Sequence, residues 1–163
     1  MLRPMVISAL ALDPVTKSPI VVLKEIDGER TLPIWIGFLE AQAIASELEG
    51  ISFSRPMTHD LLKIFFDITQ VKVERIEVCA LKGSTYFALI HISYKNNAMA
   101  IDARPSDALA LSLRVGAPIF VADSVIKNSK QTDTAGEPED RSEKGQQWTE
   151  ILKSIDSGDF GNT

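Results

Sequence analysis

The sequence predicts an α+β fold of internally duplicated β-β-β-α units, with a mostly antiparallel sheet and helices packed on it. Three observations support this prediction. The segment 101–111 repeats the plan of segment 34–44, in which a strand runs into a helix. Two pairs of turn-forming residues separate apolar runs, and each half contains an amphipathic helical pattern.

Three apolar runs in the first half predict strands, at 5–11, 19–26 and 32–34. Asp27 and Gly28 separate the last two runs, and this pair favours a tight hairpin turn. A helical stripe follows, and Gly50 predicts its C-terminal end. The stripe consists of Ala41, Ile44, Ala45 and Leu48.

A second helix is predicted from Thr58, as its N-cap, to about Ile68. Apolar residues recur on it at helical spacing, the pattern of a face turned toward a core. These residues are Leu61, Ile64, Phe65 and Ile68.

The second half repeats this plan at an offset of 67 residues, with strands predicted at 72–78, 86–93 and 98–101. Asn96 and Asn97 predict its hairpin turn. The helical stripe recurs as Ala108, Leu111, Ser112 and Val115. The duplication therefore predicts that both helices lie across the sheet and pack on it with the same helix face. Glu40 and Asp107 would then be in equivalent places.

The predicted domain spans residues 1–126 and is long enough to bury a core. Residues 127–147 are polar and contain Gly136 and Pro138, so we expect a disordered loop. A terminal helix is predicted over 148–160, and we expect it to dock on the domain. Its stripe is Trp148, Ile151, Leu152 and Ile155.

Charge is distributed unevenly along the chain, whose net charge is −5. Residues 1–122 carry 12 basic and 13 acidic side chains, and residues 123–163 carry 5 and 9. A protein that grips nucleic acid by bulk electrostatics is basic, so such binding would rely on a local patch. The candidates for that patch are Arg55, Lys63, Arg104 and Arg114.

No segment has the length of a membrane span or the pattern of a signal peptide, so a cytoplasmic protein is expected. Cys79 is the single cysteine, which excludes a disulfide within the chain and a cysteine metal cluster.

The segment 102–107 carries the first candidate chemistry. Pro105 suits the first position of a helix, which places Arg104 at the N-cap and Asp107 at the third position. Backbone N–H groups are free there, so Arg104 and Ser106 are candidate phosphate ligands. A structural interpretation stays open, because a carboxylate in the first turn also offsets the helix dipole. Asp102 is open to a structural ion pair with Arg104 or Arg114.

The second candidate lies at 55–60, where His59 and Asp60 begin a helix close to Arg55. Arg55 is the third candidate phosphate ligand, with Arg104 and Ser106. Histidine is the usual general base near neutral pH. Adjacent helical residues do not face each other, so solvated helix-start residues are the alternative. The catalytic candidates are His59, Asp60, Asp102, Arg104 and Asp107.

Carboxylates are the ligands that Mg²⁺ and Mn²⁺ prefer, and such ions support phosphodiester hydrolysis. Glu49 and Asp60 are further carboxylates that could contribute to such a metal site. The predicted metal ligands are Glu40, Asp102 and Asp107.

Several segments between about residues 4 and 126 together resemble the bifunctional nuclease domain family. They are residues 22–25, 32–37, 40–41, 48–50, 55–56, 58–62 and 101–108. The resemblance implies an α+β domain, often oligomeric, with the activity on DNA and RNA that is attributed to plant members. The segment 148–160 also resembles the short helix that ends many bacterial members.

Two functions of different class follow. One is a divalent-metal-dependent nuclease that cleaves RNA or DNA with low sequence specificity. The other is a non-catalytic, oligomeric binding or assembly module that holds a small anion. A homo-oligomer is expected in either case, because repeated β units leave strand edges that must be covered.

Overall fold

The computed structural model describes residues 1–132, in which four helices accompany one seven-stranded sheet. The strands are β1 (Leu2–Leu12), β2 (Pro19–Glu25), β3 (Thr31–Trp35), β4 (Lys72–Lys82), β5 (Thr85–Tyr94), β6 (Asn97–Ala103) and β7 (Ile119–Ala122). The helices are α1 (Phe38–Leu48), α2 (Thr58–Thr69), α3 (Pro105–Val115) and α4 (Asp123–Thr132). The strand order across the sheet is β3-β2-β1-β7-β4-β5-β6.

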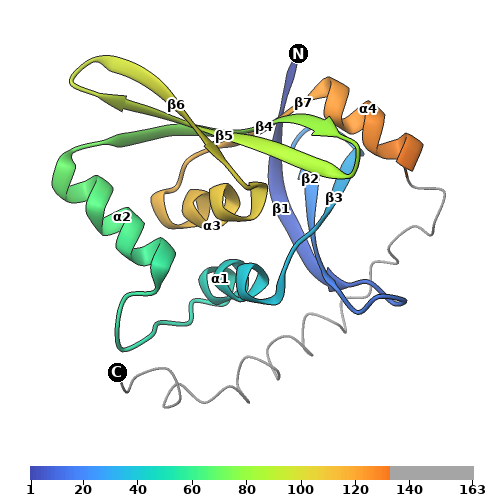
Figure 1. Cartoon of the computed structure of the whole chain (residues 1–163), viewed down its shortest axis with the longest axis horizontal. Coiled ribbons are helices and arrows are strands. Elements are labelled where there is room, and N and C mark those ends of the chain that lie inside the picture. The colour runs from blue at the N-terminus through green and yellow to red at the C-terminus, as the bar shows by residue number, and fades with distance from the viewer. Residues whose placement is uncertain (133–163) are drawn as a thin grey trace.

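The sheet and the helices form two layers. Helices α1, α2 and α3 lie together on one side of the sheet, and α4 lies apart from them beside β7 (Figure 1). Helix α3 packs on β4 and β5, and both α1 and α2 pack against α3. Among the described strands the β4–β7 pairing is parallel and the others are antiparallel. The predicted α+β class and mostly antiparallel sheet are confirmed.

Alternation along the strands places one face of the sheet in the core. Ile76 of β4 pairs with Ile90 of β5, and both are buried. The adjacent residues Glu77 and His91 point to the other face, because side chains alternate along a strand, and they bond to each other there. The core also includes Met5, Leu23, Leu32, Ile44, Leu109, Leu111 and Ile126.

Strand β7 joins the two halves of the sheet, and the sequence did not predict it. It pairs antiparallel with β1 and parallel with β4. Each half has the element order β-β-β-α. This order agrees with the duplication but does not establish that the halves superpose, so the internal duplication stays a prediction.

The second hairpin turn lies one residue earlier than predicted. Lys95 and Asn96 form it with φ angles of 46° and 66°, and Asn97 already pairs with Tyr94 in the sheet. Two positive φ angles match the twist of antiparallel strands. The tight turn is confirmed, but the assignment of Asn97 to it is wrong.

The ends of the first two helices are set by local chemistry. Gly50 follows α1 with a φ of 64°, a left-handed conformation that glycine adopts without steric cost. Met57, not Thr58, is the N-cap of α2, and its backbone N–H donates to Asp60 Oδ2 at 2.9 Å. The predicted helix is therefore correct, and the predicted cap is wrong by one residue.

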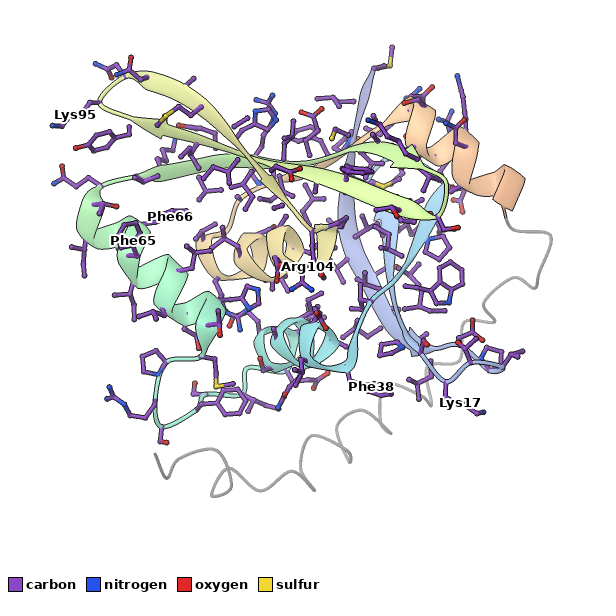
Figure 2. All side chains as sticks on the ribbon, viewed as in Figure 1. Lys17, Phe38, Phe65, Phe66, Lys95 and Arg104 are labelled. Carbon is purple, nitrogen blue, oxygen red and sulfur yellow. The ribbon has the colours of Figure 1, made fainter. Side chains whose placement is uncertain are left out.

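The apolar stripe predicted on α2 is exposed. Phe65 and Ile68 are 57% and 76% exposed, whereas Phe66 is the buried residue of this helix. Figure 2 labels both phenylalanines on α2. The helix lies at the side of the helical layer, so only the face around Phe66 meets its neighbours. Leu61, Ile64, Phe65 and Ile68 form what we call the α2 face.

Helix α4 covers the beginning of the segment predicted as a loop. Val125, Ile126 and Ser129 are buried, and the helix contacts β3, β4 and β7. Residues 127–132 are therefore helical, because a few buried positions anchor an otherwise polar stretch. The rest of the predicted loop and the predicted helix 148–160 lie outside the described residues.

Candidate functional site

Side chains from the first turns of α1, α2 and α3 meet in one polar cluster, which we call the Arg104 corner. Arg104 Nη1 donates to Glu40 Oε1 at 2.7 Å, and Arg104 Nε donates to Asp107 Oδ2 at 2.7 Å. His59 Nε2 lies 3.0 Å from Asp107 Oδ1. The corner therefore comprises Glu40, Arg104, Asp107 and His59, and Arg104 lies between α1 and α3 (Figure 2).

The local sequence places each acid of the corner. Arg104 is the N-cap of α3 and Pro105 its first residue, as predicted, and Asp107 stands in the first turn. Glu40 holds the same position in α1, and Asp60 holds it in α2. A carboxylate at a helix N-terminus is stabilised by the helix dipole. Packing of α1 and α2 against α3 then brings these three helix starts together.

Burial and hydrogen bonding act in opposite directions on Asp107. Partial burial raises the pKa of its carboxyl, but hydrogen bonds from Arg104 and His59 outweigh burial and hold the pKa below its ordinary value. The hydrogen bond to Asp107 in turn raises the pKa of the Arg104 guanidinium. Asp107 is therefore an ionised carboxylate that accepts from two partners.

Arg114 ties the helices together beside the corner, a role that the sequence did not reveal. Its side chain is 3% exposed, and its Nε donates to Asp60 Oδ1 at 2.7 Å. Its Nη1 donates to the carbonyl oxygens of Ala43 and Ala110. Burial raises the pKa of Asp60, but the hydrogen bonds from Arg114 and Met57 lower it by more, so the net shift is downward.

Other predicted site residues lie apart from the corner. Asp102 pairs with Leu89 on β5, while its neighbour Ile101 pairs with the buried Ile90. Alternation therefore directs Asp102 to the sheet face away from the helices. Ser106 is buried. Arg55 lies in the segment before α2 and has no hydrogen bond or ion pair with any described residue.

Two of the three predicted metal ligands, Glu40 and Asp107, share the corner, and the guanidinium of Arg104 lies between them. Asp102 is the third and does not join them. Within residues 1–132 no group of three or more histidine, cysteine or acidic side chains is arranged to hold a metal ion. The predicted trio does not fit a metal site in this arrangement.

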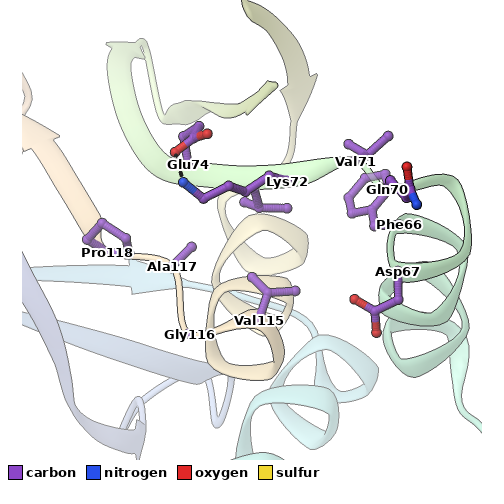
Figure 3. A pocket seen from close by; sticks show the side chains of 11 residues that line it. Phe66, Asp67, Gln70, Val71, Lys72, Glu74, Val115, Gly116, Ala117 and Pro118 are labelled. Carbon is purple, nitrogen blue, oxygen red and sulfur yellow. Dashed lines mark hydrogen bonds and ion pairs between the residues drawn. The ribbon is translucent and has the colours of Figure 1, made fainter. Parts of the chain in front are cut away.

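Two cavities of the described region lie outside the corner. A cavity of about 560 Å³ lies at the C-terminal ends of α2 and α3, between Phe66, Lys72 and Val115 (Figure 3). A second, of about 400 Å³, lies beside the N-terminal part of α2 and includes Arg55, Asp60 and Arg114. Asp60 of the second cavity follows His59 in the first turn of α2, but none of the four corner residues lines either cavity.

The corner contains the parts of an acid-base site. His59 uses Nε2 toward Asp107, which leaves Nδ1 as the ring nitrogen without a bond to any described residue. A carboxylate that holds one ring nitrogen orients the imidazole and stabilises its protonated form. The guanidinium of Arg104 is 65% exposed and supplies positive charge next to that histidine.

The sequence pattern of the bifunctional nuclease domain matches residues 21–134. The chain belongs to the bifunctional nuclease domain family. The matched region contains all four residues of the Arg104 corner. The resemblance noted in the sequence is confirmed.

This family member is similar to a mycobacterial protein and to two plant proteins. An uncharacterised protein of Mycobacterium tuberculosis is 33% identical over 150 residues, covering 89% of this chain and 90% of that protein. Bifunctional nuclease 1 of Arabidopsis thaliana is 29% identical over 107 residues, which cover 63% of this chain and 33% of the plant protein. Bifunctional nuclease 2 of that plant is 28% identical over 105 residues, with 62% and 32% covered. Across residues 1–132 of this family member, no helix is long and apolar enough to cross a membrane.

Proposed function

We propose that this protein is a nuclease that hydrolyses phosphodiester bonds of RNA or DNA with low sequence specificity. The observation that carries the proposal is the chain of contacts from His59 through Asp107 to Arg104. It provides a histidine–carboxylate pair and a cation in a member of the bifunctional nuclease domain family. The two named plant nucleases support the same class of activity.

In the proposed mechanism His59 acts as general base. Its Nδ1 takes a proton from a water molecule, the water oxygen attacks phosphorus, and the bond from phosphorus to the leaving sugar oxygen breaks. Asp107 stabilises the resulting imidazolium, which returns the proton to the leaving oxygen. Arg104 offsets negative charge that gathers on the phosphate oxygens.

A requirement for Mg²⁺ or Mn²⁺ stays a prediction from the sequence. Such an ion would supply charge stabilisation at the phosphate. The corner offers no set of ligands for it, because Asp102 does not join Glu40 and Asp107 and because Arg104 already bonds both corner carboxylates. Activity with Mg²⁺ compared with activity in a chelator tests the requirement.

The experiment that tests the nuclease compares His59→Gln with His91→Gln on labelled single-stranded RNA and DNA. The two histidines form similar pairs, His59 with Asp107 at 3.0 Å and His91 with Glu77 at 2.8 Å, but His91 lies on the other face of the sheet. Loss of a general base costs about 100-fold or more in rate, so His59→Gln should lose activity and His91→Gln should retain it. Equal activity in both variants points to a contaminating nuclease and contradicts the proposal.

A second candidate is an assembly module, favoured by the α2 face. Its side chains are apolar and 39–76% exposed, and they lie next to each other along one helix. Contiguous exposed apolar surface of this kind is typical of an interface. Edge strand β6 is also exposed from Asn97 to Asp102, so surface for self-association is present on the described part of the chain.

A further inference from the structure

The 400 Å³ cavity beside the Arg104 corner, which we call the Arg55 pocket, has the chemistry of a ligand site. It lies between the end of α1, the segment 51–56 and the first half of α2. Its volume falls within the range of small-molecule sites, about 300 to 1,000 Å³. The pocket is therefore large enough to take more than a single ion.

Three side chains bring positive charge to the pocket, and they differ in the hydrogen bonds and ion pairs that they already make. Arg114 is buried, and its Nε and Nη1 already donate to Asp60 and to two carbonyl oxygens. Lys63 pairs with Asp67 at the surface at 2.6 Å, a type of pair that is worth little in water. Arg55 has no partner among the described residues. Arg55 and Lys63 are thus the more exposed cations of the pocket, and we expect an anion to reach them first.

The other side chains make the pocket more than an anion site. Phe53 is half-buried in its lining, Ile51 and Ile64 add apolar surface, and Ser52 and Ser54 bring hydroxyl groups. An aromatic ring is a stacking platform for any base, and arginine or lysine binds phosphate. Glu47 is the remaining acid of the lining, and a carboxylate can accept from sugar hydroxyls or base amino groups.

We propose that the Arg55 pocket binds one nucleotide, with its base against Phe53 and its phosphate on Arg55 and Lys63. The inference deepens the proposed function, on which it rests for the placement of the scissile bond. The proposal requires that a strand held here runs past the first turn of α2, which carries both Asp60 of the pocket lining and His59 of the corner. The pocket would then explain how a chain of net charge −5 holds a polyanion through a local site.

Binding is measured in a chelator on the full chain, with a short labelled single-stranded oligonucleotide, adenosine monophosphate and inorganic phosphate as separate probes. Phe53→Leu should lower the affinity for the oligonucleotide about tenfold, because the aromatic ring is lost while apolar volume is kept. Arg55→Ala should lower the affinity for the oligonucleotide about fivefold at low salt, and the affinity should then depend less steeply on salt concentration. Lys63→Ala should act in the same direction.

Matched controls are present in the chain. Phe65→Leu alters an exposed aromatic residue on α2 outside the pocket, and Lys72→Ala breaks a surface pair with Glu74 like that of Lys63. Both control variants should bind as the wild type does. Melting temperatures of all variants show whether a loss of binding reflects unfolding.

The outcomes separate this inference from the proposed nuclease. Weaker binding by the pocket variants supports the nucleotide site even if the wild type hydrolyses nothing, and then only the nuclease proposal fails. Binding of inorganic phosphate with no effect of Phe53→Leu overturns the nucleotide site in favour of a plain anion site. Wild-type binding in all pocket variants also overturns it, and hydrolysis that depends on His59 would then leave the nuclease standing.

Discussion

At the scale of single residues, the carboxylate of Asp107 is the centre of the candidate site. It accepts hydrogen bonds from His59, which is 48 positions away in α2, and from Arg104, the N-cap of its own helix. Those bonds favour the charged form of Asp107, and its pKa is accordingly lowered despite partial burial. The site therefore couples a general-base candidate to the stability of the fold.

This coupling predicts a pH-dependent effect of Asp107→Asn on stability. A carboxyl with a lowered pKa in the folded state contributes stability above its unfolded pKa of about 3.9. That contribution is lost as pH falls through the lower folded pKa. The melting temperature of the wild type should therefore exceed that of Asp107→Asn at about pH 6, and the difference should close below about pH 4.

Circular dichroism melting curves across this pH range check the prediction. The control is Asp102→Asn, which removes a carboxylate that accepts no hydrogen bond from the described residues. The same pH profile for both variants would contradict the assigned role of the bonds from Arg104 and His59.

At the scale of elements, Arg114 links the three helices on this side of the sheet. It lies in the last turn of α3, yet it bonds Asp60 of α2 and the carbonyl of Ala43 in α1. Its side chain is almost fully buried, so these bonds are shielded from water. A buried charge whose partner is removed is costly, which makes this tie a structural one.

Arg114→Met should lower the free energy of unfolding by about 2–3 kcal/mol, because Asp60 and two carbonyl oxygens lose a donor. Urea unfolding measures the change. Lys63→Met is the matched control, since it breaks an exposed i, i+4 pair on α2 that is worth about 0.3–0.5 kcal/mol. Equal losses in the two variants would show that Arg114 is no stronger a tie than a surface lysine.

At the scale of the whole molecule, the helical layer is covered by the sheet on one side and carries the exposed α2 face at its edge (Figure 1). A contiguous exposed apolar surface of this kind is typical of a site that contacts another molecule. A symmetric contact between two α2 faces would cover it on both copies at once. We propose this contact as the basis of the expected homo-oligomer.

Ile68→Asp should therefore shift the protein toward monomer at tens of micromolar, because burial of a charge in an apolar contact is unfavourable. Light scattering measures the mass. Leu39→Asp is the control, since Leu39 on α1 is 75% exposed against 76% for Ile68 but lies outside the α2 face. A monomeric wild type, or equal dissociation of both variants, would count against association through α2.

The sequence by itself determined the features that depend on neighbours in the chain. The N-cap at Arg104 with Pro105 after it, the glycine end of α1 and the positive-φ hairpin turn were all predicted from a few adjacent residues. Helix caps and turns depend on contacts between residues that are close in sequence, so a few adjacent residues are enough to predict them. At the cap of α2 and at Asn97 the predictions from local patterns were wrong by one residue.

Only the tertiary structure decided which of the candidate residues meet. His59 reaches Asp107 across 48 positions and Arg104 reaches Glu40 across 64, and both pairs depend on how α1 and α2 pack against α3. Packing also left the α2 face exposed, although its apolar spacing is that of a buried helix, and the register of β6 turned Asp102 to the far side of the sheet. Periodicity shows that a helix has an apolar face, but the elements packed around it determine whether that face is covered.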